Sequence, residues 1–390
     1  MTAMKRLRIK HMGCLTTILV IVTVKIIWVA CMSGNHGSFE TEKEEILQRR
    51  NYLADKVLVS PEALLEEMPK SIGAQFQGEW ALYTCSMFSA ALTNIARLYP
   101  DTRQESLRMI DSLIGIVLSP SLRKYDAERW KEDPLESQEG DHSHISYLSH
   151  LGWMIGGYKI LGGGKKYDRL YHSLCRTMNR RILQSGSLNL QTYPDEPIYV
   201  PDMLVAIVAL SNYSRLYKDR YATTVKRWIR RARKEWLDKE TGLLASYLSV
   251  DGELFPGAPV KGSYSALNCY YLTFIDDRFA WEQYEKLLEV FRQDFLVTGI
   301  KERSEGFCLL GMDIDAGPII LRLSPTGTAF ALGSVTYFKD FSLRNRLLKT
   351  AEIAGSTVKW GDKRHYLLAD VALVGEAIVL AMRTATRWKQ

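Results

Sequence analysis

The stretch RLYKDRYATTV, residues 215–225, recurs in altered form at four other places in the chain. The related stretches are RLYPDTRQESL (97–107), GGGKKYDRLYHSL (162–174), FIDDRFAWEQY (274–284) and YFKDFSLRNRL (337–347). Each places an Asp in a short turn between two segments whose apolar residues recur at three- and four-residue spacing, which is the period of a helix. The five turns therefore predict five helical hairpins.

The regular spacing of these turns predicts how the hairpins assemble. Together with an N-terminal helix near 41–57 and a C-terminal helix at 366–384, they make six helix pairs. Such a series predicts an all-α fold, an (α/α)6-type toroid of helical hairpins with short β pieces in its loops. We expect the aspartate of each turn to cap the second helix and to have no catalytic role. These aspartates are Asp101, Asp168, Asp219, Asp277 and Asp340.

The two helices of a pair differ in composition. First helices are apolar nearly all round, as in MLVAIVALSNY (203–213), whereas second helices carry a charged face, as in KRWIRRARK (226–234). We therefore expect first helices to line the ring and second helices to cover it. The loops that enter the first helices are long and polar, so we expect the functional site at the mouth where they meet. These loops span 119–143, 185–200, 238–262 and 298–325.

The N-terminus has the character of a targeting segment. A basic head, MTAMKRLRIKH, precedes seventeen mostly apolar residues, 14–30, that only Lys25 interrupts. This pattern predicts a signal anchor over 1–31; a lipoprotein signal ending at Cys31 and a cleaved secretory signal stay open. Residues 32–40 form a polar linker and 41–390 a single toroid domain. We expect a protein anchored in the membrane by its N-terminal helix, with its bulk outside the cytoplasm, in the periplasm or cell envelope.

Charge and cysteine content narrow the possible ligands. Of the formal net charge of +7, the Lys and Arg residues of 1–31 supply five, which leaves 7 − 5 = +2 for the remainder. No basic stripe interleaved with aromatic residues stands out there, so we expect no nucleic-acid partner. The six cysteines show neither CxxC pairs nor regular spacing, which predicts no zinc motif and no disulfide framework.

The stretch HSHISYLSHLGWM (142–154) brings three histidines to one helix entrance. His144 and His150 point about 120° apart on a helix, so this stretch alone does not predict a metal site. Tyr147 and His150 share one face. We expect His150 to act as an acid/base group, with His144, Tyr147 and Trp153 near the substrate. The alternative is a buried histidine that a neighbour satisfies.

Other long loops bring further polar groups to the same mouth. Asp313 and Asp315 alternate in an extended segment and therefore face one side; they could act on a substrate, bind a cation or hold a loop. Asp202 follows Pro201 and could be either a catalytic acid or an ordinary acid of a first helical turn. We take Asp202, Asp195 and Tyr264 as further catalytic candidates. The expected substrate-binding residues from these loops are Trp80, Tyr193, Tyr199, Asp313 and Asp315.

The segments 147–182, 192–228 and 263–284 resemble the linalool dehydratase/isomerase family over roughly 75–360, best over 130–300. The resemblance implies an α/α barrel that binds small alcohols between subunits of a ring and works without metal or organic cofactor. It places the family's active-site histidine on His150 and a tyrosine on Tyr264. The family has two cysteines where this chain has Thr192 and Pro201, which argues against linalool itself as the substrate.

These observations predict an enzyme that uses no cofactor and no metal. The main interpretation is acid/base elimination, hydration or isomerisation of a small hydroxylated substrate. A carbohydrate-active lyase, epimerase or glycoside hydrolase is the alternative, because carboxylates and aromatic rings also suit a sugar. A non-catalytic binding or scaffold protein of the cell envelope is the second alternative, and a homo-oligomer is possible under each of them.

Overall fold

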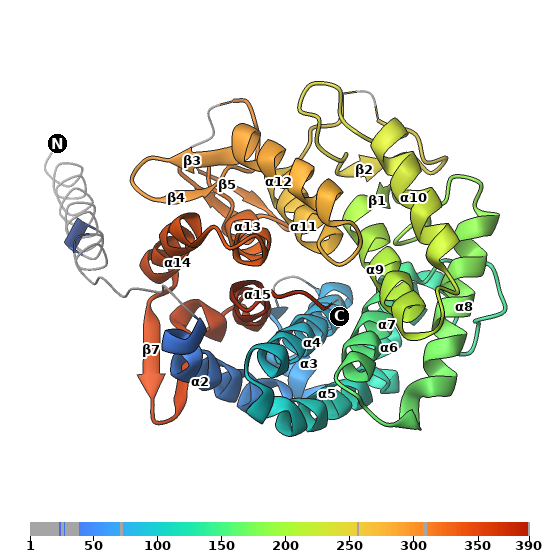
Figure 1. Cartoon of the computed structure of the whole chain (residues 1–390), viewed down its shortest axis with the longest axis horizontal. Helices are drawn as coiled ribbons and strands as arrows, with labels where there is room; N and C mark the ends of the chain where they lie inside the picture. Colours follow the sequence, from blue (N-terminus) through green and yellow to red (C-terminus); the bar gives the residue numbers. More distant parts are fainter. Residues whose placement is uncertain are drawn as a thin grey trace, which may run out of the picture.

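The computed structural model describes residues 23–24, 27, 39–70, 73–255, 257–306 and 310–388. Six helices form a closed inner ring in which each helix packs against the next and the last returns to the first (Figure 1). They are α4 (Ala74–Leu98), α7 (Ile145–Ile160), α9 (Val200–Leu216), α11 (Gly262–Leu272), α13 (Pro325–Tyr337) and α15 (Leu373–Arg383). The predicted inner helices are thus confirmed, although the last begins seven residues later than expected because Tyr366 ends a strand and Leu367–Asp370 form a separate 3-10 helix.

Six further helices cover the ring from outside, and each packs against one or two inner helices. They are α5 (Arg103–Val117), α8 (Asp168–Gln184), α10 (Ala222–Glu235), α12 (Asp277–Phe291), α14 (Phe341–Gly355) and α2 (Phe39–Val57). Burial explains which helix lies where. Every position of α9 from Val200 to Ser214 is buried, whereas α10 buries only Thr224, Trp228, Ile229 and Ala232 and exposes its charges. The predicted sorting of the pairs is therefore correct.

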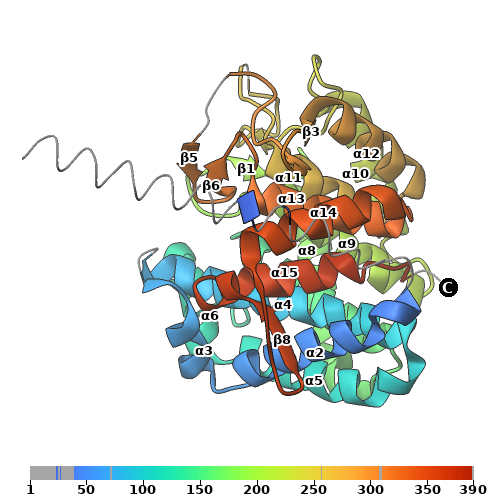
Figure 2. The same cartoon turned by 90° about the vertical axis from the view of Figure 1, so that its left-hand side faces the viewer.

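The loops also differ between the two ends of the barrel. Two short helices, α3 (Pro61–Glu67) and α6 (Pro120–Trp130), lie with the β5–β6 hairpin at one end, and the C-terminus lies at the other (Figure 2). The β pieces form four antiparallel two-stranded sheets. They are β1 (Ile198–Tyr199) with β2 (Tyr247–Leu248), β3 (Arg292–Asp294) with β4 (Thr298–Ile300), β5 (Leu310–Asp313) with β6 (Gly317–Ile320), and β7 (Thr357–Trp360) with β8 (Lys363–Tyr366).

A buried network of ion pairs joins α2, near the start of the described chain, to α14 and α15 near its end. Arg344 of α14 donates to both oxygens of Glu42 at 2.6 and 2.8 Å, and Arg383 of α15 donates to Glu42 at 2.8 Å. Nearby, Arg49 pairs with Glu376 at 2.7 Å. Burial opposes ionisation of Glu42, but the two guanidinium groups outweigh it and lower its pKa. Charges that are buried and mutually satisfied therefore hold α2 in its place as outer partner of α15.

The turn aspartates do not lie at the end of the barrel where the long loops meet. Most of them also do not cap a helix, although capping was predicted. Only Asp340 caps by its side chain, accepting from the backbone N–H of Leu343 at 3.0 Å. In α12 the cap is Asp276, while Asp277 binds Tyr337 and Arg387. The remaining three aspartates cap no helix. Asp101 and Asp168 form ion pairs with lysines, and Asp219 sits exposed in a left-handed turn with φ 57°.

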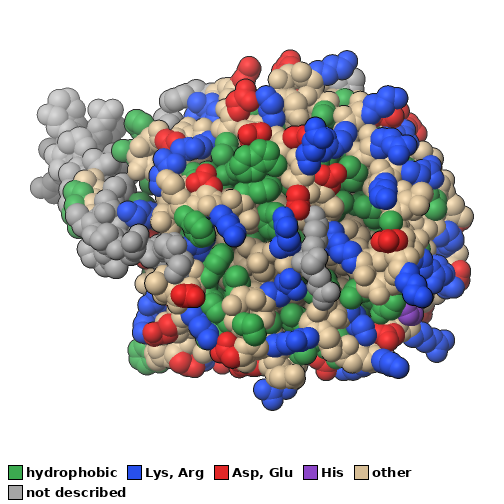
Figure 3. Space-filling model, viewed as in Figure 1, with side chains coloured by type: hydrophobic (Ala, Val, Ile, Leu, Met, Phe, Trp, Pro, Cys, Tyr) green, Lys and Arg blue, Asp and Glu red, His purple; other side chains and the backbone are tan. Residues whose placement is uncertain are grey.

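The prediction of a membrane location is corrected here. Among the described residues, no helix combines the length and the apolar character that crossing a membrane requires. The segment 1–31, on which that prediction rested, lies outside the described residues except for Thr23, Val24 and Ile27, as does the linker before Phe39. The end of the barrel that carries the C-terminus, seen in Figure 3, shows Lys and Arg side chains interspersed with Asp and Glu. The absence of a nucleic-acid partner and the homo-oligomer both stay predictions.

Loss of the cap at Asp340 should weaken the fold. Asp340→Ala removes the acceptor for the Leu343 N–H and for the Tyr284 hydroxyl, so we expect the free energy of unfolding to fall by about 0.5–2 kcal/mol. Asp251→Ala, at an exposed loop position, is the matched control and should change it by less than about 0.5 kcal/mol. Urea denaturation measures both, and equal losses in the two variants would contradict the assignment of the cap.

Breaking the ring-closing network should cost more. Glu42→Ala leaves the buried guanidinium groups of Arg344 and Arg383 without their shared partner, so we expect a loss of about 3–5 kcal/mol at pH 7. Because the folded-state pKa of Glu42 is lowered, the stability it contributes is present above its ordinary value of 4.5 and is lost as the pH falls below it. The difference between wild type and variant should therefore shrink in acid. Glu44→Ala, at an exposed site of the same helix, should change stability little at any pH.

Candidate active site

One face of α4 carries a stripe of polar side chains toward its neighbours in the ring. Glu79, Tyr83 and Ser86 stand at positions i, i+4 and i+7, so they share a face of an otherwise apolar helix. Tyr83 donates a hydrogen bond from its hydroxyl to Oδ1 of Asp202 at 2.8 Å, which connects α4 to the first turn of α9. Ser86 reaches α7 instead, where its hydroxyl lies 2.8 Å from Nδ1 of His150.

Asp202 is a buried carboxyl group that does not serve its own helix as a cap. Its second oxygen accepts a hydrogen bond from the hydroxyl of Thr192 at 2.6 Å, so each oxygen has a hydroxyl donor. Burial nevertheless dominates, and it raises the pKa of Asp202 to about 6 against the opposing effect of Thr192 and Tyr83. At pH 7 this carboxyl is therefore mostly ionised and held ready to accept a proton.

Glu79 lies near Asp202 and titrates differently. Burial, and after it the negative charge of Asp202, raises the pKa of Glu79 to about 8, although Tyr193 and Arg129 oppose the shift. The residue is partly buried, so it keeps some accessible surface. Because the two pKa values lie on either side of 7, Glu79 keeps its proton at pH 7 while Asp202 is mostly ionised.

His150 lies on α7, the inner helix between α4, which carries Glu79, and α9, which carries Asp202. It is fully buried, its ring lies 4.3 Å from that of Tyr83, and its Nε2 has no hydrogen-bond partner among the described residues. Burial lowers the pKa of His150 to about 3, so the imidazole is neutral over the physiological range. It can exchange a hydrogen bond with a substrate but is a weak base compared with Asp202.

A second group of polar and aromatic side chains lies beside the first. Lys261 contacts Asp313 and Asp315, each at 2.9 Å, so the two predicted acids do share one side and hold the β5–β6 hairpin through this lysine. The ammonium group also lies 4.9 Å from the ring centre of Tyr264. Tyr264 packs against Tyr247 and Tyr199 at 5.4 and 6.3 Å. Burial and then the charge of Asp315 raise the pKa of Tyr264, so its phenol stays a donor.

The other candidates are distributed unevenly. Tyr193 is buried under the guanidinium of Arg129, 3.6 Å from its ring centre, and Trp80 is partly buried next to Glu79 in the sequence. Tyr147, by contrast, donates to the backbone of Val117 in the outer helix α5. Asp195 is exposed in a left-handed turn with φ 61°. The structure does not bring Tyr147 and Asp195 into the cluster.

Trp153 and His144 lie in surroundings of their own. Trp153 is buried among aromatic rings, with Tyr271 at 5.5 Å, Phe274 at 5.7 Å and Trp388 at 6.0 Å between ring centroids. This packing fills the inside of the ring near the C-terminus and keeps Trp153 away from the carboxyl pair. His144 contacts carboxylates of the α6 region instead of the α4 stripe.

A cavity of about 300 Å³ lies elsewhere, on the outer ring between α10 and α12. Arg233 and Phe279 belong to its lining, and Arg233 is already bound to Glu282 at 2.6 Å. The cavity contains no histidine or buried acid with a raised pKa. We therefore assign the candidate site to the carboxyl pair on the inner helices, where polar groups with shifted pKa values converge.

Several residues of this cluster escaped sequence reasoning. Tyr83 and Ser86 were missed although the i, i+4, i+7 spacing from Glu79 was a usable signal on an apolar helix. Lys261 and Tyr247 come from an irregular loop in which no periodicity distinguishes them. The sequence gives Glu79 no role, because only the folded chain shows its nearness to Asp202.

Comparison with known proteins supports the fold and leaves the family open. No family model matches the chain. A similar solved structure is that of an unsaturated glucuronyl hydrolase specific for heparin, with a TM-score of 0.56 and 12% sequence identity over 88% of this chain and 95% of that chain. At this identity the likeness shows a shared α/α-toroid fold. Membership of the linalool dehydratase/isomerase family is not shown.

The raised pKa of Glu79 predicts how the stability of a variant depends on pH. A carboxyl whose folded-state pKa lies near 8 instead of 4.5 contributes stability below 4.5 that is lost as the pH rises through 8. Glu79→Gln keeps the neutral form at all pH values, so its melting temperature should match wild type near pH 5 and exceed it at pH 9. Scanning calorimetry across this range measures the difference. Glu240→Gln, at an exposed position, should show no such trend, and a flat difference for Glu79→Gln would refute the shift.

Proposed function

We propose that this chain is a carbohydrate-active enzyme that cleaves or forms a carbon–oxygen bond by general acid/base catalysis. Glu79 is the acid that protonates the departing oxygen, and Asp202 is the base that activates water or removes a proton. The observation that carries the proposal is the pair itself: a partly buried Glu79 on α4 and a buried Asp202 on α9, the inner helices on either side of α7, with pKa values on either side of 7. The two side chains supply both proton transfers, so catalysis needs no cofactor.

The surroundings of the pair indicate a neutral, hydroxylated substrate. Tyr199, Tyr247 and Tyr264 offer ring faces and hydroxyls of the kind that bind sugars. The nearby cations are already engaged, Lys261 with Asp313 and Asp315 and Arg129 with Glu196 at 3.0 Å. An anionic sugar would therefore meet net negative charge. The similar structure is that of a hydrolase specific for heparin, and we propose a related reaction type here with an uncharged substrate instead.

His150 supports a second candidate function, the elimination or isomerisation of a small alcohol. Its neutral imidazole offers a buried Nε2 that no described residue contacts by a hydrogen bond, and Tyr264 offers a protonated phenol. In that reaction the two residues would hold the substrate hydroxyl while the carboxyl pair moves the proton. Thermal-shift measurements with neutral oligosaccharides, heparin oligosaccharides and terpene alcohols separate the candidates. Stabilisation by the alcohols alone would replace the carbohydrate proposal with this one.

The proposal predicts a bell-shaped dependence of kcat/KM on pH with the substrate so identified. Activity should rise as Asp202 loses its proton near pH 6 and fall as Glu79 loses its proton near pH 8. Asp202→Asn and Glu79→Gln should each lower kcat by about 10²–10⁴-fold. They should also remove the acid limb and the alkaline limb, respectively.

The matched control is Asp251→Asn, at an exposed loop position, which should keep both limbs and the wild-type rate. A rate that is independent of pH between 5 and 9, or full activity in both carboxyl variants, would contradict the assignment of acid and base.

A further inference from the structure

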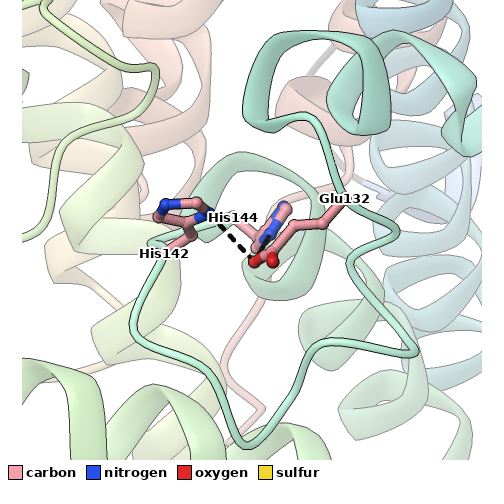
Figure 4. Close-up of side chains that lie close together, drawn as sticks. All are labelled: Glu132, His142 and His144. Atoms are coloured by element: carbon pink, nitrogen blue, oxygen red, sulfur yellow. Dashed lines mark hydrogen bonds and ion pairs between the residues drawn. The ribbon is translucent and has the colours of Figure 1, made fainter.

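The loop between α6 and α7 folds one carboxylate against two histidines. Glu132 follows α6, and its Oε1 lies 3.0 Å from Nδ1 of His142 and 3.1 Å from Nε2 of His144. Figure 4 shows the three side chains turned toward one another. The three ligand atoms all lie within 4.8 Å of one another. Ligands of a tetrahedral Zn²⁺ at about 2.0–2.1 Å from the ion are about 3.3 Å apart, so the cluster is close to the size that such an ion needs.

A buried carboxylate behind His144 fixes which of its two ring nitrogens faces the cluster. Asp126 of α6 is fully buried, and its Oδ2 lies 2.5 Å from Nδ1 of His144. A carboxylate at this distance keeps the proton on Nδ1, which leaves the lone pair of Nε2 directed toward Glu132. A carboxylate behind a histidine that turns its other nitrogen to the ion is the usual support of a histidine metal ligand.

The rest of the loop is held in place before any ion binds. Arg181 of α8 donates hydrogen bonds to the backbone carbonyls of Ser137, Gly140 and Ser143, at 2.8, 3.1 and 3.1 Å. These contacts fix the path that carries His142 back toward Glu132. Trp130 covers the two imidazoles, with its ring centre 5.4 Å from each of theirs. The ligands are thus preorganised under an apolar lid, while the half-exposed ring of His142 leaves a path for an ion from solvent.

We propose that Glu132, His142 and His144 form a binding site for Zn²⁺ or a similar divalent transition-metal ion. Two imidazoles and one carboxylate match the ligands that zinc takes, whereas Mg²⁺ and Ca²⁺ prefer oxygen ligands alone. A water molecule or the hydroxyl of Ser137, which lies 3.3 Å from Nε2 of His144, completes the coordination. The ion ties the α6–α7 connection together at the loop end of the barrel and plays a structural part.

A competing account of the same contacts needs no ion. A protonated His144 could donate from Nδ1 to Asp126 and from Nε2 to Glu132, with His142 as a surface neighbour. The two accounts differ in the role of His142, which a metal requires as a ligand and a protonated His144 does not require at all. His142 is also the safest position to change, because its exposed ring contributes little to the core.

The test uses the full chain, stripped with a chelator and dialysed. We expect titration with Zn²⁺ to show one ion per chain by elemental analysis and to raise the melting temperature, while Mg²⁺ raises it little. Titration with Co²⁺ should produce the visible absorption of a four-coordinate site. His142→Ala and Glu132→Gln should each weaken Zn²⁺ binding at least about 10-fold. The controls, His172→Ala and Glu128→Gln, are exposed residues of the same types and should bind as wild type.

Two outcomes would overturn the proposal. One is wild-type protein that binds no Zn²⁺ beyond what His142→Ala binds, which would leave the protonated His144 as the explanation. The other is Zn²⁺ binding that stays unchanged in both His142→Ala and Glu132→Gln, which would place any bound ion elsewhere. Neither readout depends on catalysis, so the result is independent of the function proposed for the carboxyl pair.

Discussion

The ring depends on the ion pairs that Glu42 makes with Arg344 and Arg383 in the interior of the protein. Five of the six hairpins are continuous in sequence, but the sixth pairs α15 with α2, and the residues that join them are 341 positions apart. Apolar contact alone would hold α2 in several registers along its groove. Buried charges tolerate one arrangement, because any shift leaves a guanidinium or a carboxylate unpaired at a cost of several kcal/mol. The buried ion pairs therefore determine the position in which α2 closes the ring.

Closure of the ring has a direct consequence for the candidate site. Glu79, His150 and Asp202 stand on α4, α7 and α9, three successive inner helices, each of which packs directly against the next. The same packing that positions them also removes water from around them, and this is what raises the pKa values of both acids and lowers that of the histidine. Reactivity and rigidity have the same origin here, since an open ring would hydrate all three groups and return them to ordinary titration.

The sequence was informative wherever a regular period operated. The helix pairs, the sorting into inner and outer layers and the loop-rich end follow from apolar spacing, which reports burial directly. It was misleading where the partner of a side chain came from another part of the chain. The turn aspartates illustrate this, because whether Asp277 caps its helix or binds Tyr337 and Arg387 depends on residues 60 and 110 positions away. Asp202 is a candidate from the sequence alone, but its hydrogen bond with Tyr83 and the raised pKa of Glu79 exist only once α4 and α9 pack on either side of α7.

The contacts of α6 show how far such long-range pairing extends. This short helix lies inside a segment, 119–143, that was expected to be a loop, and its sequence, PSLRKYDAERW, has no clear amphipathic period. It buries Leu122, Tyr125 and Trp130, packs against α4, and makes polar contacts in two directions. Asp126 binds His144 at the start of α7, while Arg129, three residues later, lies over Tyr193 and binds Glu196 in the segment that leads to Asp202. One helical turn thus connects the Glu132–His142–His144 cluster to the surroundings of the carboxyl pair. Polar side-chain contacts therefore hold the segments of the loop end to one another, whereas apolar burial holds the barrel itself together.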